Sequence, residues 1–120
     1  MKNVFLFILF FTLGVANAQK TAEERATEQS NRMKTELSLS DDQYAKVYEI
    51  NLGIIMKNDG INASTYTDEV KKQIIHSNQD ARKAMLKDVL TAAQYEKLET
   101  KVKEIKKKKR QKAENKEIKD

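Results

Sequence analysis

The sequence has 120 residues with no cysteine, no proline and one histidine, and its formal net charge is +5. Without cysteine there are no disulfides, no thiol catalysis and no thiolate metal sites. A single histidine makes a Ser-His-Asp triad implausible, and the sequence has no glycine-rich phosphate loop, so we expect no enzyme. The positive charge is concentrated at the C-terminus: residues 101–120 hold ten Lys or Arg and four Asp or Glu, a net of +6, whereas residues 19–100 hold twelve and fourteen, a net of −2.

The first 18 residues have the three parts of a cleavable secretory signal. Lys2 is the positive n-region, residues 4–15 are almost wholly apolar, and Ala16-Asn17-Ala18 is a small-x-small cleavage site. The apolar run is shorter than the roughly 20 residues that span a bilayer, which favours cleavage over a retained anchor. We expect a mature, periplasmic chain that begins at Gln19, and the lack of cysteine argues against a lipoprotein.

The mature chain has the composition of an all-α protein. It lacks proline, its only glycines are Gly53 and Gly60, and no segment alternates apolar and polar residues as a strand does. Leu, Ile and Val number 18 of the 102 residues from 19 to 120. That share lies near the roughly 20% at which a core becomes difficult to build, so a homodimer that shares apolar surface is expected.

The first two predicted helices span residues 22–37 and 41–57. Thr21 with Glu24 fits a capping box at the start of the first. Residues 58–60 should end the second, because Gly60 can adopt the left-handed conformation that follows a helix. Gly53, within this helix, suggests a bend or a close helix contact.

The third predicted helix spans residues 66–88, and the fourth begins after Thr91. The fourth helix carries a narrow apolar seam of Tyr95, Leu98, Val102 and Ile105. Beyond this seam lies a basic patch, Lys106, Lys107, Lys108, Lys109 and Arg110, and residues 111–120 are expected to form a basic and polar tail.

One pattern occurs twice, as Leu39-Ser40-Asp41-Asp42-Gln43-Tyr44 and as Leu90-Thr91-Ala92-Ala93-Gln94-Tyr95. Each copy has the features of a complete helix start: a hydroxyl N-cap (Ser40 or Thr91), a glutamine three positions later (Gln43 or Gln94), and a leucine (Leu39 or Leu90) that can pack on the tyrosine (Tyr44 or Tyr95). Both segments are therefore predicted to begin a helix.

This repeated pattern resembles the LTxxQ motif of the Spy/CpxP family of periplasmic proteins. The second copy matches at every specified position, and the first has Ser40 in place of threonine. The resemblance covers roughly residues 20–110. It implies an elongated, bent helical hairpin that dimerises into a cradle, and ATP-independent chaperoning of unfolded proteins in envelope stress or inhibition of a sensor kinase.

A chaperone-like protein needs accessible apolar side chains, preferably adaptable ones such as methionine. The candidate client-binding surface comprises Ile50, Ile54, Met56, Ile75, Met85 and Leu86. The alternative is that these residues form the hairpin core or a dimer interface.

A regulator that binds the periplasmic sensor domain of a membrane histidine kinase is the second hypothesis. The basic patch could dock on acidic surfaces of such a partner or make peripheral contact with an anionic membrane, or it could be a solvated helix end. Nucleic-acid binding is not expected of an exported protein.

Metal sensing is the third hypothesis, and the sequence gives it little support. His76 and Asp80 are four residues apart and could share a helix face. Zinc and nickel sites prefer several imidazole or thiolate ligands, so we expect a surface histidine, and neither a metal site nor another cofactor.

Overall fold

The computed structural model describes residues 19–119, and the predicted signal segment lies outside this range. Within it the chain forms four α-helices and no strand: α2 (Ala22–Leu37), α3 (Asp41–Asn62), α4 (Asp68–Val89) and α5 (Ala92–Lys119). The expected all-α class is confirmed. No helix in this part of the chain combines the length and apolarity needed to cross a bilayer.

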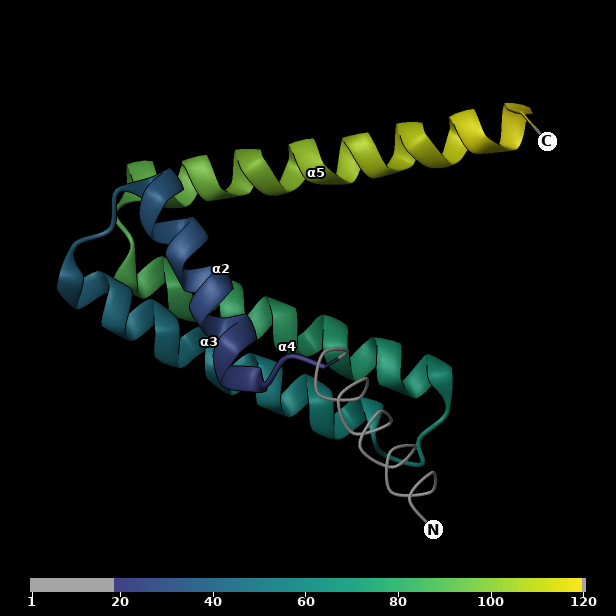
Figure 1. Ribbon diagram of the computed structural model, residues 1–120, viewed down its shortest axis with the longest axis horizontal. Coiled ribbons are helices and arrows are strands. Elements are labelled where there is room, and N and C mark those ends of the chain that lie inside the picture. The colour runs from purple at the N-terminus through teal and green to yellow at the C-terminus, as the bar shows by residue number, and fades with distance from the viewer. Residues whose placement is uncertain (1–18, 120) are drawn as a thin grey trace, which may run out of the picture.

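The molecule is elongated, with extents of 63 × 45 × 30 Å. Helices α3 and α4 run side by side as a hairpin, α2 packs on α3, and α5 leaves from the end at which α2 meets α3 (Figure 1). Helix α5 packs on the core near its start through Tyr95 and Leu98, and every described side chain from residue 103 to 118 is exposed. We call residues 103–119 the free arm of α5.

A Ser or Thr side chain caps the start of each helix. Thr21, Ser40 and Thr67 accept the backbone N–H of the residue three positions later, and so does Thr91 at the start of α5. Acidic residues fill the first turns of α2, α3 and α4, where they complement the helix dipole. These local signals explain why the predicted starts of α2 and α3 are correct and why α4 begins at Asp68, two residues later than expected.

The predicted end of α3 is wrong. The helix continues to Asn62, and Gly60 lies inside it with negative φ. Neighbouring helices hold this last turn in place: Asn78 of α4 donates to the side chain of Asn58 at 2.9 Å, and Arg25 of α2 makes a two-bonded ion pair with Asp59. These tertiary contacts outweigh the stop signal of residues 58–60.

One other expectation needs correction. A Cβ placed on Gly53 would meet no atom within 4 Å, so this glycine does not serve a close helix contact. Residues 111–119 of the predicted basic and polar tail are helical and continue α5.

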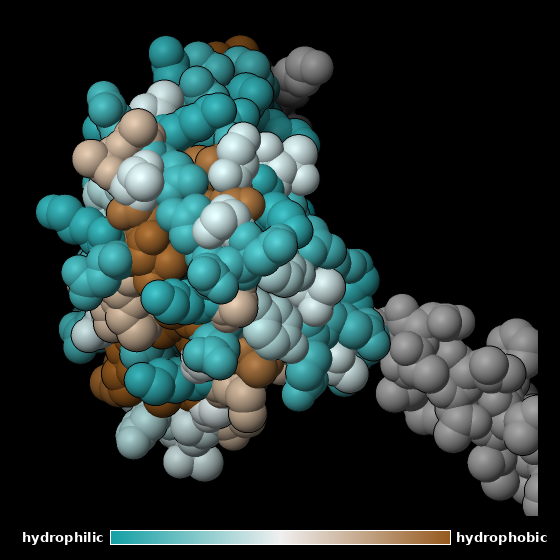
Figure 2. All heavy atoms as spheres, turned by 90° about the vertical axis from the view of Figure 1, so that its left-hand side faces the viewer, coloured by the Kyte–Doolittle hydropathy of each residue, from teal (hydrophilic) through white to brown (hydrophobic). Residues whose placement is uncertain are grey.

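The core gathers at the end where the α2–α3 and α4–α5 connections lie. Its buried members are Met33, Leu37, Leu39, Val47, Leu86 and Leu90, with Ile50, Val89, Tyr95 and Leu98 packed around them. Figure 2 views the molecule from this end, where apolar side chains reach the surface between polar ones. The two leucines of the repeated motif, Leu39 and Leu90, thus hold all four helices together.

Candidate functional site

The two repeated motifs meet at the core end through their glutamines. Gln43 Nε2 donates to Gln94 Oε1 at 2.7 Å, and Gln94 Nε2 donates to Gln43 Oε1 at 3.2 Å. Each glutamine also completes the capping box of its own helix, with Ser40 or Thr91. We call this pair the glutamine clasp.

The clasp also caps the helices that precede the motifs. Gln43 donates to the carbonyl of Val89, the last residue of α4, at 3.2 Å, and Gln94 donates to the carbonyl of Leu37, the last residue of α2, at 3.1 Å. A carbonyl at a helix C-terminus lacks an intrahelical partner. Each motif therefore starts its own helix and closes the end of another.

The tyrosines of the motifs differ in their contacts. Tyr95 packs against the core cluster that contains Leu90, and Lys87 lies over its ring at 5.8 Å. Partial burial and then the nearby Glu99 carboxylate raise the pKa of Tyr95. Tyr44 donates its hydroxyl to Asn31 of α2 at 2.6 Å. The motif region is a structural junction.

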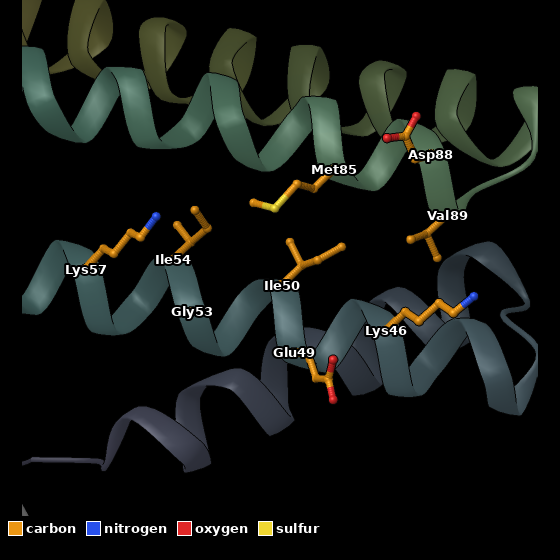
Figure 3. Close-up of a pocket in the computed structure, with 9 residues that line it drawn as sticks. All are labelled: Lys46, Glu49, Ile50, Gly53, Ile54, Lys57, Met85, Asp88 and Val89. Atoms are coloured by element: carbon orange, nitrogen blue, oxygen red, sulfur yellow. The ribbon is translucent and has the colours of Figure 1, made fainter.

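A groove of about 480 Å³ lies between α3 and α4, and Figure 3 shows it in close-up. We call it the α3–α4 groove; its lining residues are Lys46, Glu49, Ile50, Gly53, Ile54, Lys57, Met85, Asp88 and Val89. The two isoleucines of α3 point toward Met85 and Val89 of α4, with a lysine at each end of the row (Figure 3). The side chains of the isoleucines, Met85 and Val89 make the groove apolar. The charges of the two lysines and the two acidic residues at its rim cancel.

The structure divides the predicted client-binding surface. Ile50 and Met85 line the α3–α4 groove, and Met85 is 39% exposed. Ile54 forms the groove floor at 3% exposure and Leu86 is fully buried in the core, so the prediction that these two are accessible is wrong. Met56 is 56% exposed and Ile75 half-buried, both outside the groove lining.

Sequence reasoning missed Gly53, Val89 and the four charged residues as parts of the groove. Gly53 leaves bare backbone there, since nothing lies within 4 Å of an added Cβ. A glycine within the apolar face of a predicted helix was the one available signal, because glycine in a helix costs about 1 kcal/mol relative to alanine.

A second, smaller cleft of about 120 Å³ lies between α4 and the start of α5. We call it the α4–α5 cleft; it is lined by Arg82, Lys83, Tyr95, Leu98, Glu99, Val102, Lys103 and Lys106. Four cations and one carboxylate give this lining a net charge of +3. The predicted seam of α5 therefore supplies the apolar wall of the cleft, except for Ile105, which is 52% exposed.

Arg82 connects this cleft to a polar network in the core. Its Nε donates to Asn51 Oδ1 at 2.9 Å and its Nη2 to Met33 Sδ at 3.5 Å, while Asn51 donates to Ser30 Oγ at 3.0 Å. Ser30 and Asn51 are fully buried. Burial lowers the pKa of Arg82, and no carboxylate within residues 19–119 forms an ion pair with it.

The remaining predicted sites lie on the surface. The basic patch, 106–110, is exposed on the free arm of α5. His76 Nε2 lies 3.7 Å from Asp80 Oδ2 on an exposed face of α4, and residues 19–119 contain no cluster of three or more His, Cys, Asp or Glu that could hold a metal ion.

In the comparison with protein families, the model of a domain of unknown function, DUF4890, matches residues 14–98. This range contains the glutamine clasp and the whole α3–α4 groove, and it ends before the free arm of α5. Neither the curated proteins nor the solved structures contain a significant match.

Proposed function

The chain belongs to the DUF4890 family, and from its groove we propose that it is an exported, ATP-independent, chaperone-like protein that binds apolar segments of unfolded polypeptides. The α3–α4 groove carries this proposal. Its volume of about 480 Å³ falls within the range of about 300–1,000 Å³ in which ligand sites occur. Its lining is open and mainly apolar, so it suits the side chains of an extended or helical polypeptide segment better than it suits one defined small molecule.

The chemistry of the groove supports broad recognition. Met85 is flexible and polarizable, so it can adapt to side chains of different shape. The bare backbone at Gly53 leaves room for a bound main chain. The rim stays hydrated because it carries two lysines and two acidic residues, Lys46, Lys57, Glu49 and Asp88. Since their charges cancel, the rim favours neither basic nor acidic clients. The clasp supports the groove from one end, because Gln43 holds the carbonyl of the groove residue Val89.

The test is suppression of aggregation of a chemically denatured client by the chain from Gln19 onward. Met85→Glu places an unpaired charge in the groove. Gly53→Leu places a side chain in the groove, and no atom lies within 4 Å of the added Cβ that would obstruct it. We expect each change to weaken client binding about tenfold, with the far-ultraviolet circular dichroism and the unfolding midpoint preserved.

Met56→Glu is the matched control, since Met56 is also an exposed methionine but does not line the groove. It should suppress aggregation as well as the parent does. Equal losses in Met56→Glu and Met85→Glu would place client binding on the general surface, and no suppression by the parent at several-fold molar excess would refute the proposal.

Export and assembly belong to the same proposal. The signal-peptide pattern of residues 1–18 and the LTxxQ-like motifs support a periplasmic protein. The thin core and the exposed Ile105 on the free arm support a homodimer with a cradle-like shape. Light scattering of the mature chain should give the mass of a dimer, and Ile105→Glu should shift it toward monomer.

A regulatory role is the second candidate, and the free basic arm favours it. The exposed basic patch, 106–110, offers a surface for an acidic sensor domain of a membrane kinase, and its residues 107–110 lie outside the lining of the α4–α5 cleft. Replacing these five residues with glutamine should abolish a saturable interaction with such a domain, whereas Met85→Glu should leave it intact.

A further inference from the structure

We propose that the α4–α5 cleft is a binding site for a carboxylate joined to a short apolar stem, such as a medium-chain fatty acid or the free C-terminus of a polypeptide that ends in an apolar residue. This site is separate from the α3–α4 groove and shares no lining residue with it.

The charge of the cleft is the first step. Arg82, Lys83, Lys103 and Lys106 line it against the single carboxylate of Glu99. In the α3–α4 groove, two lysines and two acidic residues cancel, so the net positive charge of the lining distinguishes this cleft from that groove. Cations converging on one cavity with an apolar wall raise the local concentration of anions.

The environment of Arg82 is the second step. A partly buried guanidinium is stable when a carboxylate or phosphate pairs with it, yet here its partners are the neutral Asn51 and Met33. No hydrogen bond within residues 19–119 uses its Nη1. Asn51 is itself held by Ser30, so the guanidinium is fixed in place and has donor capacity left for a ligand.

The size and apolar wall of the cleft select the rest of the ligand. A volume of about 120 Å³ is well above the about 10–15 Å³ that admits one water molecule and below the about 300 Å³ of sites for drug-sized molecules. The cleft therefore admits an anionic end group and a few carbon atoms. Tyr95, Leu98 and Val102 provide the apolar surface against which those carbons would lie.

The test is isothermal titration of the mature chain with hexanoate, with acetate, with hexanol, and with a short peptide ending in leucine that has either a free or an amidated C-terminus. We expect hexanoate or the free-acid peptide to bind about tenfold more tightly than acetate and than the neutral analogue of the same stem, and to weaken as salt is added. Binding of hexanoate alone would identify the ligand as a fatty acid, and binding of the free-acid peptide alone would identify it as a polypeptide C-terminus.

Variants on the arm localise the site. Lys103→Gln with Lys106→Gln should weaken binding about fivefold, since each removes a lining cation, and Glu99→Gln should strengthen it about threefold. The matched control is Lys108→Gln with Lys109→Gln, which removes the same charge from the same helix outside the lining and should have no such effect. Arg82→Gln should abolish binding, and a circular dichroism spectrum of this variant checks that it is folded.

Three outcomes would overturn the proposal. The first is that neither carboxylate binds, or that acetate binds as tightly as hexanoate. The second is an equal effect of the two lysine pairs, which would indicate attraction to the arm as a whole. The third is an affinity that falls as protein concentration rises, which would show that a second copy of the chain occupies the cleft.

Discussion

At the scale of single residues, Gln43 and Gln94 have one role that is local and one that is tertiary. The local role is the capping box, in which the side-chain oxygen accepts the N–H of Ser40 or Thr91. The tertiary role uses the side-chain amide, which donates to the opposite glutamine and to the end of another helix. Glutamate could replace glutamine in the first role but has no donor for the second.

This difference predicts the effect of Gln43→Glu. The substitution keeps an acceptor for the N–H of Ser40 and for the Gln94 side-chain amide, but it loses the two bonds that Gln43 donates, to the Val89 carbonyl and to Gln94 Oε1. We expect the free energy of unfolding to fall by about 2 kcal/mol, since each lost hydrogen bond costs about 1 kcal/mol net. Urea unfolding followed by circular dichroism measures it.

A double-mutant cycle tests whether the glutamines act as a pair. Gln43→Ala and Gln94→Ala together should cost less than the sum of the two single changes, with a coupling of about 1 kcal/mol. Additive losses, or a Gln43→Glu variant as stable as the parent, would mean that the capping boxes alone explain the motif.

At the scale of helices, α3 and α5 differ in what holds them. Helix α3 packs on both α2 and α4, and these contacts carry it past Gly60 to Asn62. Helix α5 packs on the core near its start, and its exposed turns carry the basic patch, in which Lys106 and Arg110 are like charges four residues apart. Such pairs destabilise a helix, and short isolated helices are marginal in water.

This contrast predicts the effect of truncation after Ile105. The free energy of unfolding should change by less than about 0.5 kcal/mol, because the described side chains that are removed are all exposed. Amide hydrogen exchange in the intact chain should be fast from residue 106 onward and slow in α3. Loss of stability on truncation would reveal a contact of the arm, for example across a dimer interface.

At the scale of the whole molecule, the ion pair of Arg25 and Asp59 fastens the start of α2 to the last turn of α3, far from the core cluster. The hydrogen bonds from Arg25 lower the pKa of Asp59, and the same contact raises the pKa of Arg25. A carboxyl group whose pKa is lower in the folded state stabilises the fold above its unfolded pKa, about 3.9 for aspartate.

The stabilisation by Asp59 should therefore be present at neutral pH and be lost as the pH falls below about 4, through the folded-state pKa. Asp59→Asn should remove this part of the acid dependence. Urea unfolding of the parent and of Asp59→Asn at a series of pH values measures it. Identical slopes for the parent and Asp59→Asn would contradict the assigned role of the ion pair.

The sequence alone determined the local features of this protein. The absence of proline and the stripes of apolar residues specify helices, and Thr21, Ser40 and Thr91 specify where three of them begin, because a cap and its N–H partner lie within three residues. The start of α4 was predicted two residues early, because several hydroxyl residues precede it. The network of Ser30, Asn51 and Arg82 was not predicted from the sequence, because its three members come from three different helices.

Only the tertiary structure decided which of these features face one another. The clasp joins residues 51 positions apart, the α3–α4 groove opens where Gly53 lies opposite Met85, and the end of α3 follows from Asn78 and Arg25 on other helices. Burial likewise separated Leu86 in the core from the exposed Met85 beside it. The physical reason is that packing energies depend on which surfaces meet, whereas capping and helix periodicity act within one or two turns.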